Sequence, residues 1–261
     1  MGNKNKKTIG FIGSGRVTRI ILEGFKRKDI GFKEIFVSDA SLEALDSLKN
    51  KYPDITASSN NRQPASCDVV FIALHPPGVL PALDEIKSAL KQDSLLISLA
   101  PKITMSKISE KLSGFSRIVR MIPNACSVIN QGYNPLTFSP SLDEPEKKDL
   151  LRILAVLGDC PEVDEEKLEA YAILSAMGPT YLWFQLYELE KAGVSFGLTP
   201  QEARRAVSFM VEGSAKTMLE SGLTPDEVMD LIPVKPLADN EETVKNIYRS
   251  KLKGLYDKLK G

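Results

Sequence analysis

The sequence predicts an α/β protein, with a doubly wound parallel sheet in its first part and an all-α domain after it. Strand and helix signals alternate from residue 8 to about residue 162, which is typical of a parallel sheet covered by helices on both faces. The candidate strands are continuous apolar runs, as expected for strands that are buried on both faces. Beyond residue 162 the pattern is helical. We therefore expect two domains, residues 1–162 and residues 163–261.

Five strands of the sheet are expected, at residues 8–13, 34–38, 68–74, 94–99 and 117–122. A helix lies between the third and the fourth, because Leu80, Leu83, Ile86 and Leu90 recur at helical spacing. One more helix and a short strand near residues 159–163 complete the first domain. The loops that begin at His75, Ala100 and Pro123 should meet at the carboxyl edge of the sheet, where ligands of such folds bind.

The first expected strand runs into closely spaced glycines and then directly into a helix, over residues 8–20. Gly13 can make the sharp turn off the strand, and Gly15 lets a pyrophosphate approach the first free N–H groups of the helix. The third position of this G-x-G-x-x-G pattern is Thr18, which either pushes the helix outward or turns its hydroxyl into a backbone hydrogen bond. The pattern indicates a Rossmann-type dinucleotide site; the alternative is an ordinary tight turn between a strand and a helix.

The second expected strand ends in Asp39, 26 positions after Gly13. A carboxylate at about this distance binds the adenosine ribose in such sites, which favours NAD, whereas Ser38 and Ser41 offer hydroxyls that could hold the 2′-phosphate of NADP. Residue 40 is alanine, so no arginine follows immediately. The alternative role for Asp39 is to cap the next helix.

Composition excludes several classes of function. The 261 residues contain 34 lysines and arginines and 34 aspartates and glutamates, so no general positive field attracts nucleic acid or anionic lipid. The apolar share of 43% and mean hydropathy of −0.13 are those of a globular protein, and no apolar run reaches the length of a membrane span or a secretory signal. Three scattered cysteines and one histidine argue against a disulfide framework or a metal site and favour the cytoplasm.

The second domain begins its helices with clear signals. Thr199 and Thr224 are each followed by proline at the first helical position and glutamate at the third. The helix that contains residues 181–189 is apolar nearly all round and must be covered from several sides. We expect a second copy of the chain to cover it, in a homodimer or a larger assembly of dimers. The alternative is a central helix packed within one subunit.

Five stretches together resemble one known family, pyrroline-5-carboxylate reductase, over almost the whole chain. They are residues 9–15, similar to the glycine-rich opening of the family; 70–76, similar to F-x-A-V-K-P; 97–104, similar to I-S-x-A-A-G-I-T; 120–124, similar to R-x-M-P-N; and 174–181, similar to L-S-G-S-G-P-A-Y. The resemblance implies a dinucleotide-binding domain, a helical domain interleaved with its partner, and hydride transfer from NADPH or NADH to a cyclic imine. That chemistry requires alignment, a carboxylate clamp and a proton source, but no metal.

The resemblance also implies individual site residues. Gly13, Ser14, Gly15, Arg16 and Val17 would hold the pyrophosphate, and Asn60 or Asn61 would lie near the adenosine. Ala73, Leu74 and His75 would lie beside the ribose, with Ala100, Pro123 and Asn124 near the nicotinamide. Candidate proton donors are Ser175, Thr180 and Asp239, with Tyr181 as an alternative.

The substrate side departs from the family pattern. A loop S-P-G-G-T-T that receives the substrate carboxylate is replaced by residues 231–240, where two prolines remove backbone donors and Lys235 is the remaining cation. Ala176, Met177, Lys102 and Cys126 replace smaller or different residues of the family motifs. Three hypotheses follow: reduction of 1-pyrroline-5-carboxylate to L-proline, the same scaffold acting on another imine or carbonyl compound, and a dimeric nucleotide-binding protein without turnover.

Overall fold

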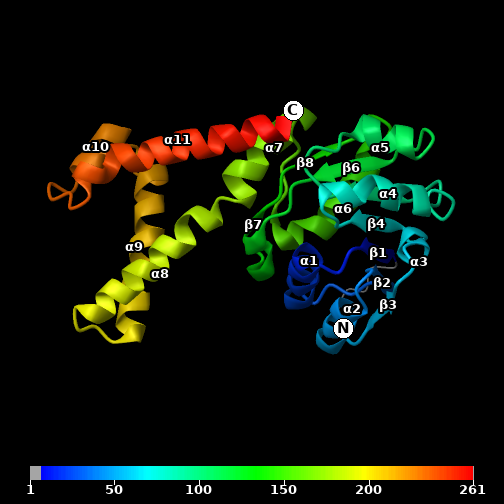
Figure 1. Cartoon of the computed structure of the whole chain (residues 1–261), viewed down its shortest axis with the longest axis horizontal. Coiled ribbons are helices and arrows are strands. Elements are labelled where there is room, and N and C mark those ends of the chain that lie inside the picture. Colours follow the sequence, from blue (N-terminus) through cyan, green and yellow to red (C-terminus); the bar gives the residue numbers. More distant parts are fainter. Residues whose placement is uncertain (1–6, 261) are drawn as a thin grey trace. The chain divides into compact units, whose positions relative to one another are not determined.

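The computed structural model describes residues 7–260. The chain forms two compact units (Figure 1). Unit 1 consists of Met1–Met177 together with Tyr256–Gly261, and unit 2 of Gly178–Leu255. The sequence predicts a domain boundary between residues 162 and 163, where alternating strand and helix signals give way to helical signals. That boundary stays a prediction.

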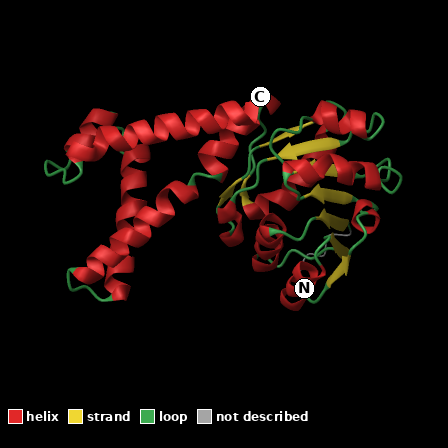
Figure 2. Ribbon diagram, viewed as in Figure 1, coloured by secondary structure: helices red, strands yellow, loops and turns green. Residues whose placement is uncertain are grey.

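A seven-stranded sheet forms the centre of unit 1 (Figure 2). Its order is β3-β2-β1-β4-β5-β6-β8, with the strands β1 Thr8–Ile12, β2 Glu34–Ser38, β3 Ile55–Ser58, β4 Val69–Ile72, β5 Leu95–Ser98, β6 Ile118–Met121 and β8 Leu136–Phe138. All neighbours pair in parallel except β8, which is antiparallel to β6. The chain moves outward from β1 to β3 and then returns to place β4 on the other side of β1. This reversal between β1 and β4 is the point at which doubly wound sheets bind their ligands.

The five expected strands are confirmed, and two further strands, β3 and β8, extend the sheet. The short strand expected near residues 159–163 is corrected: β9, Gly158–Asp159, pairs with β7, Gly132–Tyr133, in a separate small sheet. Pro161 has no N–H to donate, so the pairing does not continue as a ladder. Only an isolated bridge joins Leu136 and Glu162.

Alternate residues of each strand enter two apolar clusters, one on each face of the sheet. Phe11 and Phe71 stack with ring centroids 4.8 Å apart in the first cluster, while Ile12 and Ile72 belong to the second. The first cluster includes side chains of α1 Arg16–Arg27, α2 Leu42–Lys51 and α6 Glu144–Leu154; the second includes those of α3 Arg62–Ala65, α4 Pro76–Ile86 and α5 Met105–Lys111. Because both faces are covered, the strands read as continuous apolar runs.

A third, smaller cluster lies beyond the sheet. Ile122, Leu168 and Ala172 are buried in it, and Leu259 packs against them from the end of the chain. Two short helices contribute to this cluster, α7 Leu168–Tyr171 and the π-helical η4 Ala172–Ala176. The other short helical segments of unit 1 are η1 Ala125–Ile129, η2 Ala155–Leu157 and η3 Glu165–Lys167.

Unit 2 is helical. Its helices are α8 Pro179–Ser195, α9 Pro200–Glu220, α10 Pro225–Asp230 and α11 Ala238–Lys260, whose last turn belongs to unit 1. Thr199 and Thr224 form the expected capping boxes with Glu202 and Glu227. No helix among the described residues combines the length and the apolar character that a membrane crossing requires.

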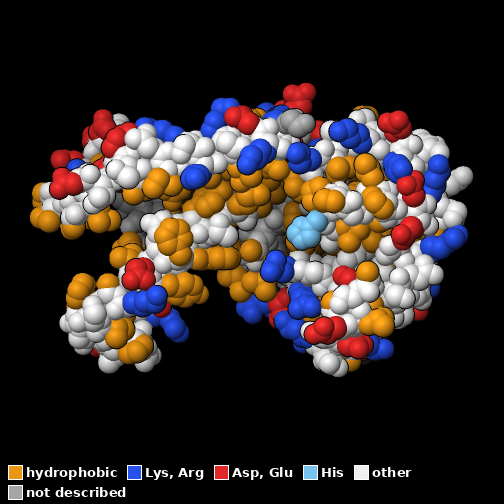
Figure 3. Space-filling view, in the orientation of Figure 1, with side chains coloured by type: hydrophobic (Ala, Val, Ile, Leu, Met, Phe, Trp, Pro, Cys, Tyr) orange, Lys and Arg blue, Asp and Glu red, His pale blue; other side chains and the backbone are white. Residues whose placement is uncertain are grey.

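The apolar helix of the sequence is α8, and none of its residues is buried. Phe184 is 67% exposed and Tyr187 62%. Figure 3 shows apolar side chains gathered over the helices of unit 2. The alternative of a central helix packed within one subunit is therefore wrong for the chain as described.

Candidate functional site

Gly13 occupies a turn that only glycine can make. Its φ is +105°, and its N–H donates to the carbonyl of Ser38 at 2.8 Å. A Cβ atom at this position would lie 2.5 Å from the carbonyl oxygen of Ala73 and 3.1 Å from a methyl carbon of Leu74. The turn after β1 is thus held between the ends of β2 and β4, and Ala73 and Leu74 lie directly against it.

Thr18 resolves the departure from the glycine pattern. Its buried hydroxyl donates to the carbonyl of Gly13 at 2.6 Å. Of the two expected alternatives, the structure has the backbone hydrogen bond. The bond ties the first turn of α1 to the glycine turn that precedes it.

The N-terminus of α1 is open to solvent. Gly15 is the N-cap residue, and no side chain accepts a hydrogen bond from the first turn. Apart from Gly15 itself and its two neighbours in the chain, no heavy atom of the described residues lies within 4 Å of the position of a Cβ on Gly15. Arg16 is exposed beside it, whereas Val17 packs partly against the core. Uncapped N–H groups with free space in front of them fit a phosphate group.

Asp39 joins the end of β2 to the glycine turn. Its Oδ2 accepts hydrogen bonds from the N–H and the hydroxyl of Ser14, both at 2.8 Å, and its Oδ1 accepts one from the N–H of Ser41 at 2.9 Å. Burial opposes ionisation, but these hydrogen bonds outweigh it and hold the pKa of Asp39 below its ordinary value. The capping alternative is wrong, because Ser41 is the N-cap of α2 and accepts from Ala44.

A chain of hydrogen bonds runs from the end of β2 to α4. The Ser38 hydroxyl donates to Asn61 Oδ1 at 2.7 Å, and Asn61 Nδ2 donates to the Glu85 carboxylate at 2.6 Å. The side chain of Asn60 has a local role, since it accepts from the N–H of Arg62. Of the two expected asparagines, Asn61 is the one that contacts a candidate residue on β2.

The loops after β4 and β5 contribute residues of different exposure. His75 is exposed and is the N-cap residue of α4, without a side-chain capping bond. Ala100 is buried. Lys102 has a φ of +71°, and its N–H donates to Oε1 of Glu169 at 3.1 Å.

A buried ionic cluster fixes the loop after β5 and the end of β6. Arg120, whose side chain is 2% exposed, donates to Glu165 at 2.9 Å and to Glu169 at 2.7 Å. Glu165 also accepts from the N–H of Met105 at 2.7 Å. Sequence reasoning missed both glutamates. Glu165 and Glu169 are four residues apart, a spacing that places two side chains on the same face of a helix. The spacing does not indicate that Arg120 is their partner.

Asn124 joins the loop after β6 to η4. It is buried, and its Nδ2 donates to the carbonyl of Ser175 at 2.8 Å, while its own N–H donates to Asn134. Two expected site residues, Asn124 and Ser175, are therefore neighbours in unit 1. The Ser175 hydroxyl donates to the carbonyl of Tyr171 at 2.8 Å.

The other two candidate proton donors belong to unit 2. Thr180 is exposed in the first turn of α8, and Asp239 is exposed in the first turn of α11. Tyr181 packs edge-on against Tyr248, with ring centroids 6.0 Å apart.

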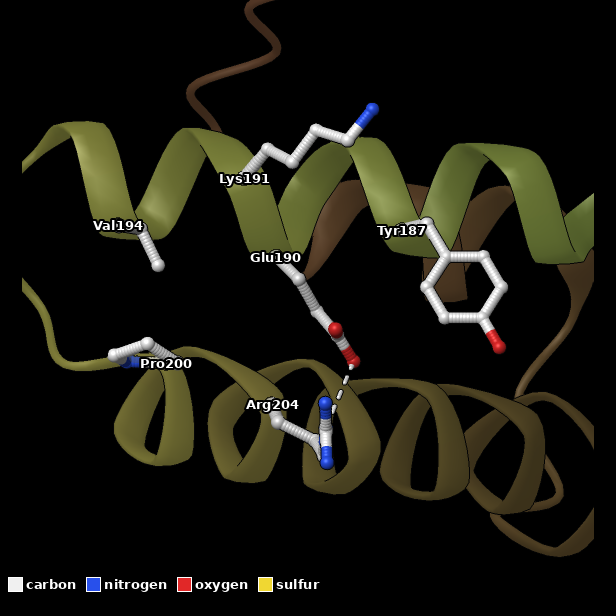
Figure 4. Close-up of a pocket in the computed structure, with 6 residues that line it drawn as sticks. All are labelled: Tyr187, Glu190, Lys191, Val194, Pro200 and Arg204. Atoms are coloured by element: carbon white, nitrogen blue, oxygen red, sulfur yellow. Dashed lines mark ion pairs between the residues drawn. The ribbon is translucent and has the colours of Figure 1, made fainter.

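A hollow of about 690 Å³ lies between α8 and α9 (Figure 4). Glu190 and Arg204 face each other across it, with Nε 3.8 Å from the carboxylate oxygen. Tyr187, Lys191, Val194 and Pro200 complete its lining. None of the residues expected at the catalytic or cofactor site lines this hollow.

Comparison with known proteins matches both parts of the chain. Residues 8–102 match a family model described as NADP oxidoreductase, coenzyme F420-dependent, and residues 165–236 match one described as pyrroline-5-carboxylate reductase dimerisation. The pyrroline-5-carboxylate reductase of Corynebacterium melassecola is 25% identical, over 95% of this chain and 93% of its own length. That of Escherichia coli is 27% identical, over 87% of this chain and 85% of its own.

Two solved structures are similar over nearly the whole chain. A pyrroline-5-carboxylate reductase from Coxiella burnetii is 30% identical, with a TM-score of 0.70, over 98% of this chain and 95% of its own. The pyrroline carboxylate reductase of Plasmodium falciparum, solved with NADP bound, is 24% identical, with a TM-score of 0.83, over 98% of this chain and 97% of its own.

Proposed function

Because the chain belongs to the pyrroline-5-carboxylate reductase family, we propose that it is an NAD(P)H-dependent reductase that transfers a hydride to the C=N bond of a cyclic imine. The reference reaction is the reduction of 1-pyrroline-5-carboxylate to L-proline. The observation that carries the proposal is the open N-terminus of α1, next to Gly13 and Asp39 at the reversal point of the sheet. Such a terminus binds the pyrophosphate of a dinucleotide.

Residues of unit 1 would hold the dinucleotide. We assign the pyrophosphate to residues 13–17, the adenosine side to Ser38, Asp39, Asn60 and Asn61, and the nicotinamide side to Ala73, Leu74, His75, Ala100, Pro123 and Asn124. When bound, a reduced nicotinamide supplies the hydride. The remaining tasks of the chain are to align the imine, to exclude water and to provide a proton at the imine nitrogen.

Ser175, Thr180 and Asp239 are the proposed proton donors. Ser175 is supported by its contact with Asn124, which fixes the segment that carries it. Its hydroxyl proton is directed at the carbonyl of Tyr171, so proton donation to a substrate requires that this hydrogen bond be exchanged. Thr180 and Asp239 are supported by their exposed positions in the first turns of α8 and α11.

We also propose that the working protein is a homodimer or an assembly of dimers. Unit 2 exposes a set of large apolar side chains on α8, and monomers rarely leave such a set open to water. The set consists of Leu182, Trp183, Phe184, Tyr187 and Leu189. A second copy of unit 2 would cover them and complete a site that one chain leaves open.

The decisive experiment is an assay of the purified protein with 1-pyrroline-5-carboxylate and either NADH or NADPH. We expect loss of the reduced nicotinamide absorbance, with L-proline as the product. Binding of a dinucleotide without turnover of this substrate would exclude the reference reaction, but it would agree with the proposed dinucleotide-binding site.

A second candidate substrate class, another imine or a carbonyl compound, is favoured by residues 231–237. This segment is exposed and contains Pro233 and Pro236 but no glycine, so it offers few backbone N–H groups for a carboxylate. The same assay with a panel of cyclic imines and ketones tests this candidate. Turnover of a substrate without a carboxylate, at a higher kcat/KM than 1-pyrroline-5-carboxylate, would support it.

A further inference from the structure

The carboxylate of Asp39 accepts hydrogen bonds from the same donors that a phosphate at this position would need. Both donors of Ser14, its N–H and its hydroxyl, are directed at Oδ2, and the N–H of Ser41 is directed at Oδ1. Ser14 is fully buried, so these donors face the carboxylate and not solvent. A second anion placed beside Asp39 would have to compete with the carboxylate for them.

The hydrogen-bond donors that contact this carboxylate among the described residues are neutral groups of Ser14 and Ser41. Within residues 7–260, Asp39 forms no ion pair with a lysine or an arginine, and the hydrogen bonds that lower its pKa come from neutral groups. Residues 40–42 are Ala, Ser and Leu, so the arginine that accommodates a 2′-phosphate in other dinucleotide sites does not follow the strand. A phosphate here would meet one fixed negative charge that no ion pair with a described lysine or arginine neutralises.

One of the two Nδ2 protons of Asn61, next to the end of β2, is also committed to an acid. Asn61 Nδ2 donates to Glu85, and Asn61 Oδ1 is occupied by the hydroxyl of Ser38. The Ser38 hydroxyl is therefore committed to Asn61, and one of the two Nδ2 protons of Asn61 is committed to Glu85. A ribose 2′-hydroxyl is different, because it donates its own proton to a carboxylate that is held ionised.

We propose that Asp39 makes this chain selective for NADH over NADPH. The inference rests on the proposed function, since it assumes that the site binds a nicotinamide dinucleotide. It goes further by assigning the cofactor form to one residue: Asp39 accepts a hydrogen bond from the ribose 2′-hydroxyl and repels a 2′-phosphate.

The test measures dissociation constants of NADH and NADPH for the full-length protein by the change in nicotinamide fluorescence, without any substrate. The wild-type chain is expected to bind NADH at least tenfold more tightly than NADPH. In Asp39→Asn, which keeps the shape of the side chain and removes its charge, this ratio should fall at least fivefold because NADPH binding improves. Asp46→Asn on α2 is the matched control, since it removes an exposed charge nearby and should leave the ratio unchanged.

Equal or tighter binding of NADPH by the wild-type chain would overturn the inference, and so would an unchanged ratio in folded Asp39→Asn. Both results leave the proposed function intact. If neither dinucleotide binds, the proposed function itself fails. The wild-type ratio requires no variant, so the inference can be tested even if Asp39→Asn does not fold.

Discussion

Lys102 holds a backbone conformation that usually belongs to glycine. Its φ of +71° places the backbone of this residue in the left-handed region, which is strained for a residue with a Cβ. We expect Lys102→Gly to stabilise the protein by about 1 kcal/mol, because the strain is removed while the N–H contact to Glu169 is kept. Urea unfolding monitored by circular dichroism measures the change.

The control for this prediction is Lys107→Gly, which lies on the exposed side of α5 in ordinary helical geometry. Glycine there should destabilise by about 1 kcal/mol. A loss of stability in both variants would mean that the conformation of Lys102 is not the source of strain.

Gly13 and Gly15 are two residues apart and have different tasks. In Gly13→Ala the new methyl meets the carbonyl of Ala73 at 2.5 Å, so we expect the thermal midpoint of unfolding to fall by several degrees, in line with a loss of about 2 kcal/mol or more. In Gly15→Ala the methyl meets nothing, and the thermal midpoint should stay near that of the wild type. Calorimetry of both variants distinguishes the two glycines.

Dinucleotide binding gives the complementary result. Gly15→Ala places a methyl at the open end of α1, where it would keep the pyrophosphate away from the backbone. We therefore expect the affinity of this variant for the dinucleotide to fall about tenfold. Unchanged affinity in this folded variant would contradict the assignment of the pyrophosphate to residues 13–17.

At the scale of elements, the loop after β5, the end of β6 and the segment from η3 to α7 meet at the Arg120 cluster. Burial raises the pKa of Glu169, but hydrogen bonding and charge from Arg120 outweigh it, so the pKa stays below its ordinary value of 4.5. The stabilisation from this lowered pKa is complete above about pH 5 and is lost as the pH falls through the folded pKa. Acid should therefore loosen these elements.

We expect Glu169→Gln to lower the free energy of unfolding by about 3 kcal/mol at neutral pH, because it leaves Arg120 with one carboxylate. The variant should also lose less stability than the wild type between neutral pH and about pH 4. Urea titrations at both pH values test this. Glu166→Gln, an exposed neighbour, is the control, and equal pH dependence in wild type and Glu169→Gln would contradict the prediction.

The elements that the sequence predicts are those whose chemistry is local. The buried strands β1, β4 and β5 are unbroken apolar runs, and the capping boxes at Thr199 and Thr224 depend on residues three apart. The strand β3 escaped prediction because it is a short edge strand with Thr and Ser, buried only in part. The strand β8 has three residues and depends on its pairing with β6.

The candidate site divides in the same way. The spacing of Gly13 and Asp39 follows from a strand, a helix and a strand in succession, so sequence alone brings them together. Arg120 and Glu169 are 49 residues apart and carry no common motif. Their pairing depends on the path of the whole chain, which no local pattern contains.

At the scale of the whole molecule, the exposed apolar face of α8 is the surface that we propose for association of two copies. We expect Phe184→Glu to convert the homodimer to a monomer, because a charge would be buried in the interface that we propose. Light scattering coupled to size-exclusion chromatography measures the mass. Phe184→Leu, which keeps the face apolar, should remain dimeric; a dimeric Phe184→Glu would show that another surface joins the subunits.

The chain returns to unit 1 after it has formed unit 2. Leu259 packs against the cluster around Leu168, and the Lys260 ammonium donates to the carbonyl of Glu166 at 2.6 Å. The polypeptide thus passes between the units twice, once after Met177 and once before Tyr256. Unit 2 is topologically an insertion into unit 1, the unit that contains the sheet.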